Sequence, residues 1–158
     1  MAPRQSLNLY YTNIGEEGIK AVAAALKENR SLSLDLSLYL SGNNIGNEGG
    51  KAVAAALKEN QSLISLNLQN NRIDSEGAEA VAAALKENQS LASLNLDGND
   101  IGSEGAEAVA SLTALKVNWS LILLEMEQFT NEMYEDLQLN GEIYSAKTRR
   151  KMLEPVAD

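Results

Sequence analysis

The strongest constraint on this chain is a nine-residue segment that occurs three times without a change. The sequence AVAAALKEN stands at residues 21–29, 52–60 and 80–88. Valine, alanine and leucine recur in it at helical spacing, which predicts an amphipathic helix with one apolar stripe. Repetition at this interval predicts an array of similar units that bury their core between neighbours, not a globule with one irregular core.

A second pattern precedes the helical segment in each of two successive units. It has the spacing L-x-x-L-x-L-x-x-N-x-I, with leucines at alternate positions followed by an asparagine. The matching residues are Leu63, Leu66, Leu68, Asn71 and Ile73, and then Leu91, Leu94, Leu96, Asn99 and Ile101. Alternation predicts a strand, so each unit is expected to be a strand, a turn and a helix.

This phased spacing, over residues 6 to about 126, resembles the leucine-rich repeat family. The unit length of roughly 28 residues with a full helix is similar to the ribonuclease-inhibitor-like branch, as in NOD-like receptor repeat domains and Ran GTPase-activating proteins. The resemblance implies a right-handed α/β solenoid, with parallel strands on the concave side and helices on the convex side. It also implies a non-catalytic scaffold that binds another protein on the concave face of its sheet.

The predicted organisation has three parts. Residues 1–5 form an N-terminal tail, and residues 6–126 form four helix-containing repeats plus a final strand. Residues 127–158 depart from the repeat pattern and are expected to form a C-terminal helical cap and tail. Trp119 is expected to pack beneath that cap, because large aromatic side chains usually bury most of their area.

The repeat spacing is irregular near the second strand. Leu7 and Leu38 are 31 residues apart, whereas Leu38 and Leu66, and then Leu66 and Leu94, are 28 apart. The added residues fall in SLSLDLSLYL at 31–40, where alternating leucines predict a strand longer than its neighbours. Two interpretations stay open, a tolerated surface bulge and a local widening of the binding face.

Asparagines recur at two places in the repeat, and both are interpreted as structural. In the family, the column Asn43, Asn71 and Asn99 hydrogen-bonds the backbone at the bend from strand to helix, and buried amides require such partners. Asn60 and Asn88, with Asn29 before them, are expected to end helices in the left-handed conformation. The Asn-x-Ser sequons that they create are therefore interpreted as helix ends, not as glycosylation sites.

Glycines are expected to serve packing. Gly49 and Gly77 follow the helix start in their units, where a missing side chain would let helix and strand approach closely. The segment GNNIGNEGG at 42–50 lacks the Lys-Ser/Thr ending of a phosphate-binding loop. The chain has neither histidine nor cysteine, so the familiar nucleophile and base pairs are missing. We expect no enzyme activity, no cofactor and no metal site.

Charge restricts the class of partner. Asp and Glu number 22 against 13 Lys and Arg, a net charge of −9, which argues against a nucleic acid and favours a protein partner with a basic patch. No apolar run is long enough for a secretory signal or a membrane span, so no membrane partner is expected. The absence of cysteine fits a reducing, cytoplasmic location.

The candidate binding surface is the outward face of the sheet, where side chains alternate with the buried leucines. Its character changes from tyrosines through amides to acids along the array, and tyrosine is enriched at protein interfaces. The predicted partner-binding residues are Tyr10, Tyr39, Asn67, Gln69, Asn95, Asp97, Glu125 and Glu127, with Asn8 and Ser41 on the same face. The alternative interpretation is a solvated polar face without a ligand.

Other functional interpretations stay open. One is regulation of a small GTPase in the manner of the Ran GTPase activators. Another is an engineered or consensus-like array with no natural ligand, which the three identical nonapeptides favour. A third is self-association through the first strand, because an exposed strand edge is a template for pairing.

Overall fold

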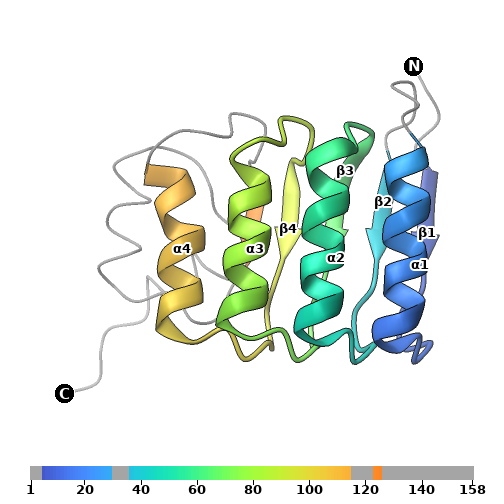
Figure 1. Cartoon of the computed structure of the whole chain (residues 1–158), viewed down its shortest axis with the longest axis horizontal. Helices are drawn as coiled ribbons and strands as arrows, with labels where there is room; N and C mark the ends of the chain where they lie inside the picture. Colours follow the sequence, from blue (N-terminus) through green and yellow to red (C-terminus); the bar gives the residue numbers. More distant parts are fainter. Residues whose placement is uncertain (1–4, 30–35, 115–122, 126–158) are drawn as a thin grey trace.

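The computed structural model describes residues 5–29, 36–114 and 123–125, and within them strands and helices alternate strictly (Figure 1). The strands are β1 (Gln5–Asn8), β2 (Leu36–Tyr39), β3 (Leu63–Asn67), β4 (Ser93–Asn95) and β5 (Leu123–Glu125). The helices are α1 (Gly15–Glu28), α2 (Gly46–Glu59), α3 (Ser75–Leu85) and α4 (Gly102–Ala114). Units 1 to 4 are β1 with α1, β2 with α2, β3 with α3 and β4 with α4. The predicted strand, turn and helix unit is confirmed.

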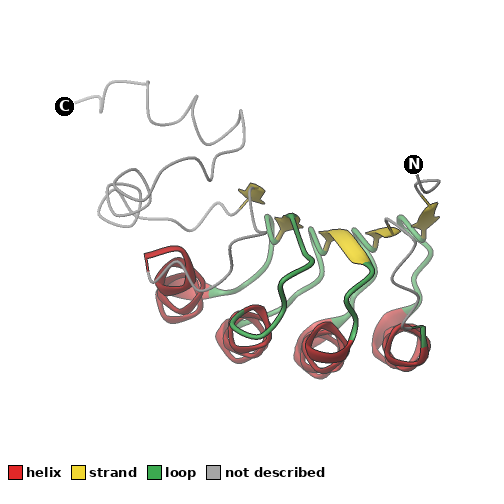
Figure 2. Cartoon of the chain, turned by 90° about the horizontal axis from the view of Figure 1, so that it is seen from above, coloured by secondary structure: helices red, strands yellow, loops and turns green. Residues whose placement is uncertain are grey.

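All five strands belong to one parallel sheet in chain order. Figure 2 shows the strands in the inner layer of a curved array and the helices in the outer layer. Each helix packs on the next one, and each strand pairs with the next one. This arrangement confirms the predicted α/β solenoid, with strands on the concave side and helices on the convex side.

The pairing of the strands follows the leucine phase that the sequence predicts. Leu7 pairs with Leu38, Leu38 with Leu66, and Leu66 with Leu94. Strand β2 has four residues and β3 has five, so β2 is not the longer strand within the described residues. The register shifts by one residue where β2 meets β3, and residues 30–35 lie outside the described part.

The core lies between the two layers and is made of small and branched apolar side chains. In α2, Val53, Ala56 and Leu57 are fully buried, and the same positions of α3 repeat this stripe, as predicted. On the sheet side, Leu66 and Leu68 are buried against the helices. Alanines keep the helix layer close to the sheet, because a larger side chain in that layer would need more volume than a close-packed interior leaves.

The expected left-handed helix ends are wrong. Asn29 and Asn60 follow α1 and α2 with φ of −81° and −87°, and α3 already ends at Leu85, before Asn88. Asn60 acts through its side chain instead. Its Nδ2 donates to the Leu26 carbonyl at 2.8 Å, and its Oδ1 accepts from the Leu63 N–H at 2.8 Å.

Asn88 makes the same bonds one unit later, so Asn60 and Asn88 form a ladder of hydrogen-bonded side-chain amides at the C-terminal ends of the helices. Its Nδ2 donates to the carbonyls of Leu57 and Asn60, and its Oδ1 accepts from the Leu91 N–H. Asn60 and Asn88 are 1% and 0% exposed, so both amides are enclosed in the folded chain. Their burial supports the interpretation of these sequons as structural.

The close approach at the repeat glycines is real, but its partners differ from those expected. A Cβ on Gly49 would collide with Ile45 of its own unit and with Ile19 of α1. A Cβ on Gly77 would collide with Ile73 and with the side chain of Asn47 in α2. The glycines therefore bring neighbouring helices together at their N-terminal ends, instead of bringing a helix onto a strand.

Candidate interaction surfaces

The bend after each strand is held by the first asparagine column. Asn71 Nδ2 donates to the carbonyls of Leu40 and Leu68 at 2.8 and 2.9 Å, and Asn71 Oδ1 accepts from the Asn43 N–H at 2.8 Å. Asn43 and Asn99 repeat this pattern in their own units, and all three side chains are buried. The structural interpretation of this column is confirmed, because every amide hydrogen-bonds to the backbone around the bends.

Because the bends are built alike, the same backbone conformation recurs at fixed positions around them. Three rows of residues across the units have positive φ values between 51° and 71°. Row one contains Tyr11, Gly42, Asn70 and Gly98; row two contains Asn13, Asn44 and Arg72; row three contains Gly15, Gly46 and Gly102. The left-handed region favours glycine and, more weakly, asparagine, so most of these residues suit their positions.

Two residues do not suit the conformation that their row imposes. Tyr11, with φ of 51°, stands where units 2 and 4 have glycine. Arg72, with φ of 57°, stands where units 1 and 2 have asparagine. A side chain larger than glycine costs about 1–2 kcal/mol in this region, so both residues hold the folded chain in a less favourable local state.

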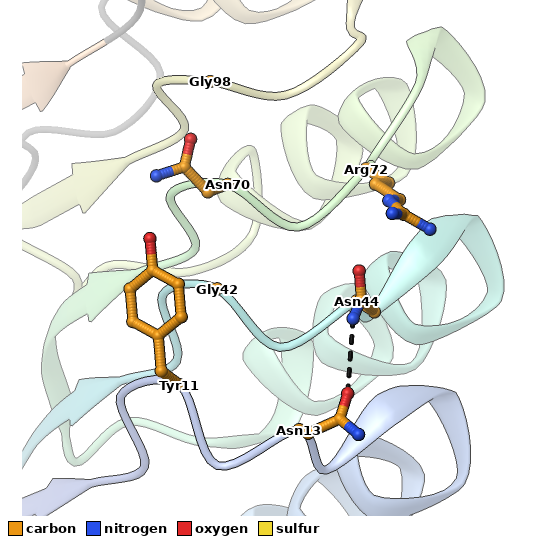
Figure 3. Close-up of a pocket in the computed structure, with 7 residues that line it drawn as sticks. All are labelled: Tyr11, Asn13, Gly42, Asn44, Asn70, Arg72 and Gly98. Carbon is orange, nitrogen blue, oxygen red and sulfur yellow. Dashed lines mark hydrogen bonds between the residues drawn. The ribbon is translucent and has the colours of Figure 1, made fainter.

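Rows one and two face each other across an open groove of about 500 Å³ at the end of the sheet where the strands run into the bends (Figure 3). We call it the loop groove. It is lined by Tyr11, Asn13, Gly42, Asn44, Asn70, Arg72 and Gly98. Its five non-glycine residues are also the five non-glycine residues with positive φ in the described part of the chain.

Within the loop groove, side chains of one unit lie over glycines of the next. The ring of Tyr11 lies against Gly42, and the amide of Asn70 lies against Gly98, so a Cβ on either glycine would collide. Asn44 Nδ2 donates to Asn13 Oδ1 at 3.3 Å. The repeat pattern did not point to this site, although Tyr11 replaces the glycine or asparagine of row one and Arg72 replaces the asparagine of row two.

The predicted concave surface is only partly exposed. Strand pairing places Tyr39, Asn67, Asn95 and Glu125 side by side across the sheet. Tyr10 and Tyr39 are 56% and 38% exposed. Asn67, Gln69 and Asn95 are half-buried.

Other members of the predicted set do not contribute an open surface. Asp97 is only 3% exposed, and Ser41 is fully buried. Only the backbone of Glu125 is described. Glu127, Trp119 and the predicted cap at 127–158 lie outside the described residues. Whether these residues bind a partner stays a prediction.

The asparagines of the concave surface also have a local structural role. Asn67 Oδ1 accepts from the Gln69 N–H at 2.9 Å, and Asn95 Oδ1 accepts from the Asp97 N–H at 2.9 Å. Asn8 makes the equivalent bond to the Tyr10 N–H. Asparagine commonly caps its own backbone two residues on, so its recurrence here follows from the end of each strand and does not by itself indicate a ligand.

Electrostatics single out one carboxylate near the bends. Asp74 takes the place of the row-three glycine in unit 3 and caps α3, where its Oδ1 accepts from the Glu76 and Gly77 N–H groups. A hydrogen bond from the Asn47 side chain, helped by these backbone N–H groups, holds the pKa of Asp74 below its ordinary value.

Within the described ranges no cluster of three acidic side chains is placed to hold a metal ion, and no helix is long and apolar enough to cross a membrane.

Comparison with known proteins identifies the class. A family model described as "Leucine Rich repeat" matches residues 29–54, 59–82 and 87–110, one match for each of three successive units. The chain is therefore a leucine-rich repeat protein. Domains of this class are generally non-enzymatic scaffolds for protein interactions.

A solved structure shares the fold over most of its length. It is leiomodin-1 actin-binding site 2, which is 24% identical; the match covers 94% of this chain and 84% of that one, with a TM-score of 0.73. No curated protein matches the sequence significantly. The ribonuclease-inhibitor-like branch is consistent with these findings.

Proposed function

We propose that this protein is a non-catalytic scaffold that binds a partner protein on the concave face of its sheet. The observation that carries the proposal is the exposure of Tyr10 and Tyr39 on that face, next to the amides of Asn67 and Asn95. Tyrosine supplies apolar area together with a hydroxyl group, and few side chains combine the two. The aromatic end of the face would supply most of the affinity, and the amides would supply orientation.

The partner that fits best has a basic patch. The chain has a net charge of −9, and complementary charge accelerates association with a basic surface. Actin is a concrete protein to test, because the structural neighbour leiomodin-1 is described by an actin-binding site. The likeness to that neighbour concerns the fold, so actin enters as one candidate among protein partners.

The proposal is tested by affinity capture with the purified chain as bait, followed by a direct binding measurement with each captured protein and with actin. The test variant carries Tyr10→Ala and Tyr39→Ala, which remove exposed rings without touching the core. We expect the variant to lose a partner that the wild type retains. Binding should weaken further with added salt, since screening reduces attraction between opposite charges.

A matched control uses the convex side. Glu79 and Ala83 are exposed on α3, so Glu79→Ala and Ala83→Ser change the opposite face without touching the core. These variants should bind as the wild type does. Equal capture by the wild type and the tyrosine variant, with loss in the convex variants, would show that the helices carry the interface instead.

Self-association through β1 is the second candidate. All four residues of β1 are exposed, and Leu7 is 44% exposed. The Leu9 N–H donates to the Tyr39 carbonyl beside β2. Backbone N–H groups point alternately to the two sides of a strand, so the Ser6 N–H points away from β2, to the open edge. If β1 pairs with a second copy, light scattering should show a dimer that Ser6→Pro abolishes. The same molecular mass for the wild type and the Ser6→Pro variant would remove this alternative.

Regulation of a small GTPase stays a sequence-based alternative to which no described residue is assigned.

A further inference from the structure

The loop groove contains two side chains that the fold does not require. At the position of Tyr11 the other units use glycine or asparagine, and at the position of Arg72 units 1 and 2 use asparagine. Those residues adopt the left-handed conformation more easily than tyrosine or arginine does. Strained residues of this kind cluster at binding sites when the side chain has a use there, and here all of them line a single groove.

Arg72 supplies the charge of the groove. It is exposed, and no carboxylate of the described residues lies within ion-pair distance of its guanidinium, including Asp100 at the same place in the next unit. The other polar side chains of the groove are neutral: the amides of Asn13, Asn44 and Asn70, and the hydroxyl of Tyr11. An arginine in such surroundings favours a carboxylate, because the planar guanidinium binds both carboxylate oxygens together.

The rest of the groove fits an extended peptide. The backbone N–H groups of Asn13, Asn44 and Arg72 have no acceptor among the described residues, so they are left for water or for a bound carbonyl. Row one runs across four units, and the three strand spacings of about 4.8 Å that it spans equal roughly four residues of extended chain. Tyr11 lies at the unit 1 end and Arg72 lies in unit 3, so the two groups are separated along that length (Figure 3).

We propose that the loop groove is a second binding site, which takes an extended peptide segment bearing a carboxylate side chain. Arg72 binds the carboxylate, the amides of Asn13 and Asn44 bind the peptide backbone, and the Tyr11 ring contacts an apolar side chain about three residues away. This site is built from the bends. Because the Tyr10 ring of the concave face packs on the Tyr11 ring, Tyr39→Ala is the concave-face variant that separates this site from the proposed function.

The test uses an array of capped eight-residue peptides, each with one Asp or Glu at a varied position and an apolar residue at a varied distance from it. Each peptide has a copy in which Asn or Gln replaces the acid. We expect the purified chain to bind a subset of acidic peptides at least tenfold more tightly than their amide copies. Arg72→Asn should abolish that discrimination, and Tyr11→Gly should weaken binding of the same peptides.

Both substitutions place in the groove a residue that another unit already has there, so the fold is expected to persist, and circular dichroism checks it. Tyr39→Ala, on the concave face, is the control and should leave peptide binding unchanged. Three results would overturn the proposal: no preference for acidic peptides in the array, retained preference in Arg72→Asn, or an equal loss in Tyr39→Ala.

Discussion

The asparagine column and the loop groove lie on the same bends and have the same period, but they differ in what is repeated. In the column, Asn43, Asn71 and Asn99 share one residue type and one set of hydrogen bonds. In the groove, only the backbone conformation is shared, while the side chains range from glycine to Tyr11 and Arg72. A fixed residue type indicates a requirement of folding, whereas a fixed conformation with varied side chains leaves the surface free for binding.

Asp74 shows that a departure from the repeat can also serve folding. It replaces the left-handed glycine of row three and adopts φ of −94°. Its side chain accepts hydrogen bonds from two backbone N–H groups at the start of α3. Tyr11 and Arg72 have no such compensation among their described contacts, apart from the packing of the Tyr11 ring on Tyr10 and Gly42. The comparison therefore separates departures that stabilise the fold from departures that do not.

The largest expected effect is at the column. Asn71→Ala removes three donated bonds and one accepted bond and leaves the buried Asn43 N–H without its acceptor, whereas the Leu40 carbonyl keeps the bond from Asn43 Nδ2. We expect the free energy of unfolding to fall by about 3 kcal/mol, since each buried group left unpaired costs about 1–3 kcal/mol. Urea denaturation followed by circular dichroism measures this loss. Gln69→Ala, half-buried on the sheet face, is the control, and a loss as small as that of the control would refute the structural role.

The next effect concerns Asp74 and depends on pH. Its folded pKa is depressed, so the ionised cap stabilises the protein above the unfolded pKa, and this stabilisation is lost as pH falls through the folded pKa. Asp74→Ala should therefore lower the melting temperature at pH 7 and differ less from wild type in acid. Asp74→Asn keeps a capping oxygen without a titrating group, so the melting-temperature difference between Asp74→Asn and Asp74→Ala should stay constant as the pH falls. A difference between wild type and Asp74→Ala that is constant from neutral to acidic pH would contradict the assignment.

The smallest effect has the opposite sign. Arg72→Asn places a residue tolerated in the left-handed region at a position with φ of 57°, so the free energy of unfolding should rise by up to about 1 kcal/mol. The same denaturation experiment measures it, with Arg72→Lys as the control that keeps the strain. If Arg72→Asn destabilises the chain, Arg72 has a folding role, and the distinction between column and groove fails at this residue.

Much of the fold could be predicted from the repeat alone. The leucine phase gave the strand pairing, and the alanine-rich stripe gave the buried faces of α2 and α3. The role of Asn71 also followed, because an apolar repeat that keeps one amide needs hydrogen-bond partners for it. These features share one cause, since each depends on the period of the sequence and not on the details of any one unit.

Other features depend on backbone conformation and side-chain contacts, which the spacing of the repeated residues does not specify. Asn60 fits both a left-handed helix end and a buried ladder, and only its φ and its amide contacts decide between them. Alternation placed Asp97 on the outward face but gave no account of its burial. The loop groove follows from a left-handed backbone at Tyr11 and Arg72, where those residue types would not be expected.

The column has a direction, and that direction makes the array extensible. Asn71 accepts from the N–H of Asn43 in the preceding unit, and the Asn71 N–H donates to Asn99 in the following unit. Each unit thus presents complementary ends, like the monomer of a head-to-tail polymer. A duplicate of residues 61–88 inserted in frame would find a donor on one side and an acceptor on the other. Every added unit would lengthen the loop groove by one strand spacing.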